Sequence, residues 1–406
     1  MTPSTAFDQI HLSWAECTST TLTVTWHAPK ALACGVRYRL PGAGEWLYAP
    51  GDVVPTDSKG VIYRTTLRGL APAAAYEYHI STAPNQQPAQ QSAIFVGRTA
   101  PQGHADLRFG FLTDTGLIGR PDGNTTGTAQ VLAEIAREQP LFLLGAGDYA
   151  YGNRDGRYEV MADAVDAWFN QVQDLLANMP FMPQYGNHEI HLRERYEDWA
   201  PRFAHADGPE DGRYYSFDVA DIHFTALFVP HGEISEAQGA WLDEDLTKAR
   251  ARNPRWLIVY QHDSIYGHGT SHPANPKVRA AVAPLMEKHG VDLHLSAHDQ
   301  NYERTYPLAG VPDQVTVCNH DLHRYAKGNG VIYAKISPCG KMSEIGNKFS
   351  TFTEPQQPFM AVRDDTAHHY AMVDVSASGE LAVTVYSVVG DGSPKVLLDH
   401  FVIGIN

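Results

Sequence analysis

From residue 107 onward, short apolar runs alternate with segments whose apolar residues recur at helical spacing. The apolar runs are 107–112, 141–144, 257–260 and 293–296, and the helical segments are 128–137, 165–176 and 238–250. Each run stops at a loop that carries Gly, Asp or His, which is typical of a strand buried in a sheet. This alternation of strands and helices predicts an α/β domain in which layered β-sheets are flanked by helices.

The first part of the chain has the period of β-strands alone. Apolar and polar residues alternate from Leu22 to Trp26, as expected of a strand with one buried face. Leu70, Pro72 and Tyr76 match the tyrosine-corner region of fibronectin type III and immunoglobulin-like domains. We therefore expect a seven-stranded all-β sandwich at 1–98, a linker at 99–105 and the α/β domain at 106–406.

Charge and cysteine content exclude several classes of protein. The 406 residues carry a formal net charge of −15, which repels nucleic acid and anionic membranes. The same field repels anionic substrates, so any site for an anionic ligand in this chain needs a local source of positive charge, such as metal ions. The four cysteines form no CxxC pair, which argues against a zinc ribbon. Cys17 and Cys34 either form a disulfide or, as we favour, are buried thiols.

The chain carries no recognisable membrane segment. Its first residues lack the basic and apolar regions of a signal peptide, and no apolar run approaches the roughly 20 residues of a membrane span. We expect a soluble protein, either cytoplasmic or secreted after removal of a signal. It should have no membrane or nucleic-acid partner, and its oligomeric state is left open.

Five polar side chains lie at or just beyond the ends of the predicted strands. Taken singly, each has a simpler explanation: Asp114 is more readily a cap or turn residue, and Asn187 a residue that hydrogen-bonds within its loop. Ligands of α/β sheets bind outside the carboxyl ends of the strands, where carboxylates, amides and imidazoles together can bind a metal ion. The sequence therefore predicts a metal site built from Asp114, Asp148, Asn187, His262 and His298.

The order of these residues resembles the motif series of the calcineurin-like metallophosphoesterases. The motifs are Asp114-x-Gly, Gly147-Asp148-x-x-Tyr151, Gly186-Asn187-His188-Glu189, Val259-x-x-His262 and Ala297-His298-x-Gln300. The tyrosine three residues after the second aspartate narrows the resemblance to the purple acid phosphatases, whose catalytic domain also follows a fibronectin type III-like sandwich. The resemblance covers nearly the whole chain and implies a metal-dependent hydrolase of phosphoric esters.

The resemblance also implies the cofactors. Two metal ions are expected, Fe together with Zn, Mn or Fe, and a metal pair of this kind activates water and clamps the oxygens of an in-line displacement. The implied ligands are the bridging Asp148, then Asp114, Tyr151 and Gln300 for the first metal, and Asn187, His262 and His298 for the second.

The implied reaction is direct attack of a metal-bound hydroxide on the phosphorus of a small-molecule phosphate ester. Asp148 and His188 are the expected catalytic residues, with His188 stabilising charge or protonating the leaving oxygen. His188, His191 and His268 are the expected substrate-binding residues. His191 is three residues from His188, which excludes the HExxH motif of zinc proteases, and a structural role for it is equally open. His268 lies in a Gly-rich loop that is either pocket lining or solvated.

One position departs from the resemblance. The family's last motif ends in His-x-His, whereas this chain has Gln300 at the second position, and an amide is a weaker ligand than an imidazole. We expect a weakened first metal site, with His320 or His323 as possible substitutes. Three alternatives stay open beside the monoesterase: a phosphodiesterase or phosphotriesterase, a single-metal enzyme acting on a specialised metabolite, and a catalytically silent protein that binds phosphate ligands.

Overall fold

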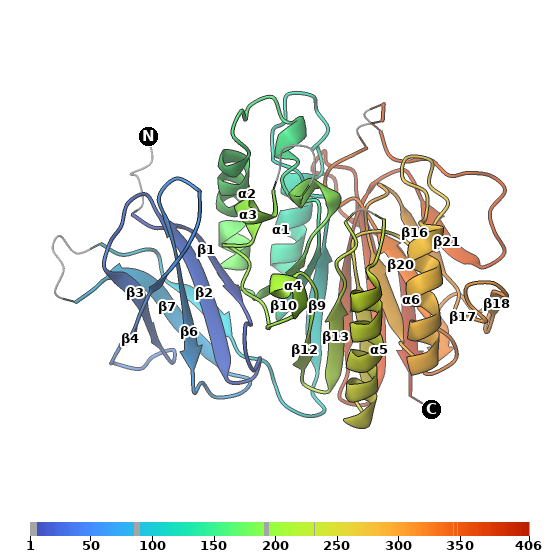
Figure 1. The fold of residues 1–406 in the computed structure, drawn as a ribbon, viewed down its shortest axis with the longest axis horizontal. Coiled ribbons are helices and arrows are strands. Elements are labelled where there is room, and N and C mark those ends of the chain that lie inside the picture. The colour runs from blue at the N-terminus through green and yellow to red at the C-terminus, as the bar shows by residue number, and fades with distance from the viewer. Residues whose placement is uncertain are drawn as a thin grey trace.

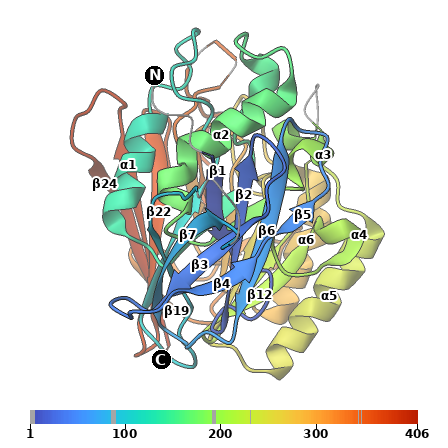
Figure 2. The same cartoon turned by 90° about the vertical axis from the view of Figure 1, so that its left-hand side faces the viewer.

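A small β-sandwich at one end of the molecule packs against a larger layered domain (Figure 1). The computed structural model describes residues 6–84, 90–190, 195–230, 232–343, 345–346 and 348–405. The sandwich is on the left of Figure 1, and Figure 2 views the molecule from that side. Every helix within these ranges is too short or too polar to cross a lipid bilayer.

Two four-stranded antiparallel sheets form the sandwich. In order across each sheet, the strands are β1 (Asp8–Ser13), β2 (Thr21–Ala28), β6 (Val61–Arg68) and β5 (Asp52–Val54), then β4 (Leu47–Pro50), β3 (Cys34–Arg39), β7 (Ala75–Thr82) and β8 (Phe95–Arg98). The expected number of seven strands is wrong, because the chain leaves one sheet as β4 and enters the other as β5. Gly51 makes this passage possible, since a Cβ there would lie 2.6 Å from the Trp26 ring.

Two local expectations for the sandwich can be compared with the structure. The Tyr76 hydroxyl accepts a hydrogen bond from the main-chain N–H of Ala71 at 2.9 Å, which is the contact that defines a tyrosine corner. Cys17 and Cys34 are free thiols, as favoured, but only Cys34 is buried and Cys17 is exposed.

The larger domain is built on two seven-stranded mixed sheets. The first contains, in order, β11 (Phe181–Gln184), β10 (Phe142–Ala146), β9 (Leu107–Leu112), β22 (His368–Val375), β23 (Glu380–Val388), β24 (Val396–Gly404) and β19 (Arg324–Ala326). The second contains β12 (Tyr215–Val219), β13 (Ile222–Ala226), β14 (Trp256–Tyr260), β15 (Leu293–Ser296), β20 (Ile332–Ile336), β16 (Tyr302–Thr305) and β21 (Met360–Asp364). A separate hairpin pairs β17 (Leu308–Ala309) with β18 (Thr316–Val317).

Each large sheet contains a group of at least three neighbouring parallel strands, and in the first sheet β19 also pairs parallel with β24. These groups are β9, β10 and β11 in the first sheet and β13, β14, β15 and β20 in the second. Parallel neighbours end at the same edge, so the loops that follow them are brought together there. That edge is where the sequence placed its candidate ligands.

The two sheets pack face to face, and helices cover their outer faces. Phe142 of the first sheet contacts Phe224 of the second with ring centroids 5.5 Å apart. The apolar faces of α1 (Thr128–Glu138) and α2 (Met161–Leu176) pack on the first sheet, and those of α5 (Glu236–Ala251) and α6 (Pro276–His289) pack on the second. The short helices are α3 (Tyr196–Trp199) and α4 (Pro209–Gly212). This architecture confirms the predicted fold class.

The sandwich and the layered domain share one apolar core. Trp14 of the sandwich lies 5.3 Å from Phe142 by ring centroids, and the Tyr78 hydroxyl donates a hydrogen bond to the Ala177 carbonyl oxygen at 2.7 Å. The boundary expected at 99–105 stays a prediction. α6 was not expected from the sequence. Its N-cap is Asn275, whose side chain accepts hydrogen bonds from the N–H groups of the first turn.

Candidate metal centre

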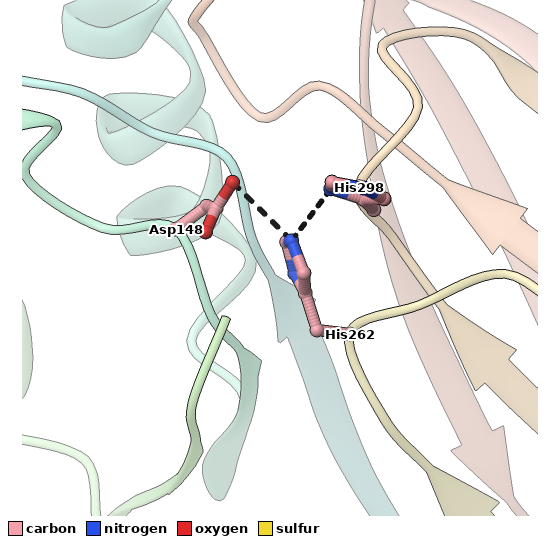
Figure 3. A group of neighbouring side chains, drawn as sticks. All are labelled: Asp148, His262 and His298. Atoms are coloured by element: carbon pink, nitrogen blue, oxygen red, sulfur yellow. Dashed lines mark hydrogen bonds and ion pairs between the residues drawn. The ribbon is translucent and has the colours of Figure 1, made fainter. Parts of the chain in front are cut away.

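The loops that follow five parallel strands converge at one edge of the two sheets. Asp114 follows β9, Asp148 follows β10, Asn187 follows β11, His262 follows β14 and His298 follows β15. Figure 3 shows Asp148, His262 and His298 pointing toward one another. One ligand atom from each of these three residues lies within 4.8 Å of the others.

The backbone of these loops is strained where the site residues lie. Asp114, Asp148, Tyr151 and His298 have φ angles of 45°, 57°, 53° and 75°. Left-handed backbone costs roughly 1–3 kcal/mol for residues with a Cβ and persists only where the surrounding structure enforces it. Four strained residues around one point are typical of a functional site.

The carboxylate of Glu189 holds two of the loops together. It accepts hydrogen bonds from the main-chain N–H groups of Asp148, Tyr149 and Gly186 at 2.6, 2.8 and 2.7 Å. Burial and then the charge of Asp148 raise the pKa of Glu189, whereas the three N–H donors oppose that rise. Gly147 must be glycine here, because a Cβ would lie 2.1 Å from the main-chain nitrogen of Gly186. These contacts fix Asp148 beside Asn187.

The residues expected to bind the second metal, Asn187, His262 and His298, form what we call the second-metal half. His262 donates through Nδ1 to the Ala146 carbonyl oxygen at 2.6 Å, which directs Nε2 toward Asp148 Oδ2 at 3.2 Å and His298 Nδ1 at 3.0 Å. Burial lowers the pKa of His262, but the Asp148 carboxylate raises it by more, so that the pKa is about 10. Among the described residues, the buried Asn187 Oδ1 has no hydrogen-bond donor.

This donor set fits a metal ion. With its Nδ1 hydrogen given to Ala146, neutral His262 has a bare Nε2 that faces both the Asp148 carboxylate oxygen and His298 Nδ1, and an amide oxygen lies buried beside them. A positive charge between these groups is favoured, either as a proton on His262 or as a metal ion, and imidazole and carboxylate ligands suit Zn, Mn and Fe. The second-metal half therefore has the ligand chemistry that the sequence predicts for a metal site.

The residues expected at the first metal, Asp114, Tyr151 and Gln300, form the first-metal half, and they are arranged differently. Asp114 is fully buried, and the Tyr151 hydroxyl donates to its Oδ1 at 2.8 Å. Burial, followed by the charges of Asp114 and Asp148, raises the pKa of Tyr151 well above its usual value. Gln300 turns its amide nitrogen toward Asp114 Oδ1, at 3.4 Å. Here Asp114, the Tyr151 hydroxyl and the Gln300 amide nitrogen are bonded to one another, whereas the buried Gln300 Oε1 has no donor among the described residues.

The expected substrate-binding histidines have three different outcomes. The His188 ring packs against Tyr151 with centroids 4.1 Å apart, and its Nδ1 bonds Asn153 Oδ1 at 2.7 Å. His191 lies outside the described residues. His268 is placed away from the site, because its main-chain N–H bonds the Glu303 carboxylate at 2.7 Å and its ring packs on Phe359.

A pocket of about 390 Å³ opens beside the second-metal half. Asn187 and His298 line it together with His272 and Asp263. The His272 ring lies 4.2 Å from the His298 ring, so His272 rather than His268 faces this pocket. Burial raises the pKa of Asp263 to about 6, although the nearby His262 charge opposes that shift. The volume is within the usual range for a small-molecule site.

Several residues at the site were missed by sequence reasoning. Ser337 donates to Asp114 Oδ2 at 3.0 Å, and the Lys341 ammonium lies 4.0 Å from the centroid of the Tyr151 ring. Both residues follow β20. Had that strand been identified from the sequence, the expectation that ligands lie beyond strand ends would have pointed to them. His320 and His323 are exposed and contact Tyr306 and the His400 carbonyl oxygen instead of Asp114, so neither substitutes for the missing imidazole.

Comparisons with known proteins agree with this geometry. Residues 107–302 match the family model of the calcineurin-like phosphoesterases, and residues 7–99 match the model of the purple acid phosphatase N-terminal domain. Together the two models cover more than two thirds of the chain.

Individual relatives point the same way. Acid phosphatase type 7 from Homo sapiens is 29% identical over 337 residues, which are 75% of this chain and 72% of that protein. Purple acid phosphatase 15 from Arabidopsis thaliana is 26% identical over 282 residues, which are 63% of this chain and 52% of that protein, about half its length. The structure of a purple acid phosphatase from seeds of yellow lupin (Lupinus luteus) has a TM-score of 0.85 at 18% identity, covering 99% of this chain and 75% of that one. At that identity the likeness shows the fold alone.

The family models, these relatives and the ligand cluster at the sheet edge support one assignment: residues 107–302 form a calcineurin-like phosphoesterase domain, preceded at residues 7–99 by a purple acid phosphatase N-terminal domain.

Proposed function

We propose that this protein hydrolyses small phosphate monoesters at the edge where the two large sheets meet. The observation that carries the proposal is the group of Asp148, His262 and His298, whose ligand atoms lie within 4.8 Å of one another beside a pocket of about 390 Å³. The human relative's name, acid phosphatase, supports the same substrate class.

Asp148, Asn187, His262 and His298 would hold the ion. Such an ion, when bound, supplies Lewis acidity to a phosphoryl oxygen and lowers the pKa of coordinated water. The protein's part is to keep these ligands in place: Glu189 bonds the Asp148 backbone, and the Ala146 carbonyl fixes the tautomer of His262. Purple acid phosphatases bind two metal ions. For this protein we propose Fe together with Zn, Mn or Fe.

His188 is positioned to act on the phosphate. Its main-chain N–H donates to Asp148 Oδ1 at 2.9 Å, and Asn153 holds its Nδ1, so the imidazole is fixed next to the ligand group. An imidazole in this position can stabilise charge on the transferring phosphoryl group or protonate the leaving oxygen. His272 and Asp263 would shape the pocket on the other side.

The test is hydrolysis of 4-nitrophenyl phosphate, bis(4-nitrophenyl) phosphate and diethyl 4-nitrophenyl phosphate, with Fe, Zn and Mn supplied. We expect the monoester to be hydrolysed fastest. Asp148→Asn should lower the rate by at least about 10–100-fold, since loss of a residue that merely supports a ligand already costs that much. Asp174→Asn, which removes the same charge from an exposed position on α2, should keep the wild-type rate. If wild type and Asp148→Asn are equally slow on all three esters, the proposal is wrong.

A further inference from the structure

Asp114 already has a full set of hydrogen-bond donors from the protein. Oδ2 accepts from Thr113 Oγ1 at 2.7 Å, from Ser337 Oγ at 3.0 Å and from the His298 N–H at 3.3 Å, and Oδ1 accepts from Tyr151 at 2.8 Å and Gln300 at 3.4 Å. An ionised carboxylate offers about four acceptor positions. Little capacity therefore remains on Asp114 for a metal ion.

Gln300 presents a donor where the family has a ligand nitrogen. Its Nε2 lies 2.7 Å from the His298 carbonyl oxygen and 3.4 Å from Asp114 Oδ1. Both neighbours are acceptors, so turning the amide to bring its oxygen to this position would place three oxygens together. The hydrogen-bond network therefore fixes the orientation of the amide, which is how such assignments are made. The first-metal half gains a hydrogen-bond donor and loses a ligand.

A buried cation is present on the same side. Lys341 is fully buried, its main-chain N–H donates to the Asp114 carbonyl oxygen at 3.1 Å, and its Nζ lies 4.0 Å from the centroid of the Tyr151 ring. Nζ also donates to the Met342 carbonyl oxygen at 2.8 Å. An ammonium over an aromatic face is attracted to the ring, and a buried ammonium needs negative charge nearby. Asp114 accepts the hydrogen bond from the hydroxyl of that same ring, so its carboxylate lies on the side of the ammonium.

The second-metal half contrasts with this arrangement. Asn187 Oδ1 has no donor among the described residues, and the facing nitrogens of His262 and His298 lie 3.0 Å apart. In the first-metal half both Asp114 oxygens accept hydrogen bonds and a lysine lies over Tyr151, although the buried Gln300 Oε1 also has no donor among the described residues. The two halves therefore differ in whether the carboxylate and the imidazoles are already bonded within the protein.

We propose that Lys341 takes the place of the first metal, so that this protein binds a single ion in the second-metal half. The inference rests on the proposed function, because it concerns the same centre. Asp114, Tyr151 and Gln300 then form a hydrogen-bonded wall, and the Lys341 ammonium offsets the charge of Asp114. Lys341 acts in this wall as a positioning residue, through Tyr151 and Asp114.

The test is metal content per chain by plasma mass spectrometry, with the visible spectrum recorded after reconstitution with Fe, Zn and Mn. Wild type should carry a single ion and show no tyrosinate-to-iron absorption band. Asn187→Ala and His298→Ala should lose the ion, whereas Asp114→Asn should keep it. The double variant Gln300→His, Lys341→Asn should gain a second ion and, with iron, the visible band.

Lys341→Arg serves as the matched control, because it keeps the charge and should keep the wild-type metal count. Far-UV circular dichroism and thermal melting establish that each variant is folded. If the double variant does not fold, the wild-type count and the contrast between Asp114→Asn and His298→Ala still decide the question.

Two outcomes overturn the inference. Wild type with two ions, one of which is lost in Asp114→Asn, would show that the first-metal half binds metal. If that protein also hydrolyses the esters, the proposed function stands while this inference falls. Wild type with no ion after reconstitution would overturn the inference as well, and together with inactivity on the ester panel it would remove the proposed function too.

Discussion

Removing the Glu189 side chain should destabilise the layered domain by a large and calculable amount. The carboxylate is the acceptor for three main-chain N–H groups, those of Asp148, Tyr149 and Gly186, at 2.6–2.8 Å. Glu189 is fully buried, so water cannot replace it. Glu189→Ala therefore leaves three buried donors without an acceptor.

Each unsatisfied buried N–H costs about 1–3 kcal/mol. The loss of a buried carboxylate offsets part of this sum, because burying a charge is itself unfavourable. We expect a net destabilisation of about 3–6 kcal/mol. The entropy of unfolding is about 2.1 cal/mol/K per residue, or roughly 0.6 kcal/mol/K for a domain of about 300 residues. The melting temperature should therefore fall by about 5–10 °C.

Differential scanning calorimetry measures this shift. Glu197→Ala is the matched control, since Glu197 is an exposed glutamate on α3 and its loss should move the melting temperature by less than about 1 °C. Glu189→Gln, which keeps one of the two oxygens, should lie between the alanine variant and wild type. A Glu189→Ala protein that melts within about 1 °C of wild type would refute the reasoning, because it would mean that the N–H groups find other acceptors.

Two further predictions concern buried charges. Arg304 of β16 donates to Asp399 of β24 at 2.6 and 3.1 Å, so Asp399→Ala should cost about 3–5 kcal/mol by leaving a buried guanidinium unpaired. Urea unfolding measures this cost, and the double variant Arg304→Met, Asp399→Leu should recover part of it. An Asp399→Ala unfolding midpoint equal to that of wild type would contradict a stabilising role for this ion pair. Burial lowers the pKa of His223, but Asp218 and Asp245 raise it more, to about 9, above the roughly 6.5 of an unfolded histidine. Its stabilising contribution is complete below about pH 6.5 and is lost as the pH rises through about 9. Melting curves at pH 6 and 9.5 should show this loss in wild type and not in His223→Asn, and equal pH dependence of the two proteins would exclude it.

The sequence was sufficient to predict where the strands end and which side chains follow them. Asp114, Asp148 and His262 could be placed at strand ends because an apolar run that stops at a polar loop is a local signal. The fold class followed from the same alternation and is confirmed by the two large sheets. α6 was missed because its apolar positions form no clear stripe, and the number of sandwich strands was underestimated because only Gly51 separates β4 from β5.

What the sequence alone determined is the set of ligand types and their order along the chain, together with the substitution at Gln300. Only the tertiary structure decided what Gln300 does. Its neighbour Asp114 is 186 residues away, and the donor Ser337 approaches the same carboxylate from 223 residues away. Whether an amide offers its oxygen or its nitrogen depends on the acceptors around it, and these are assembled only when distant loops meet at the sheet edge. The position of Lys341 over Tyr151 has the same origin: a strand-end rule could have placed Lys341 near the site, but only the path of the loop after β20 brings its ammonium over the ring.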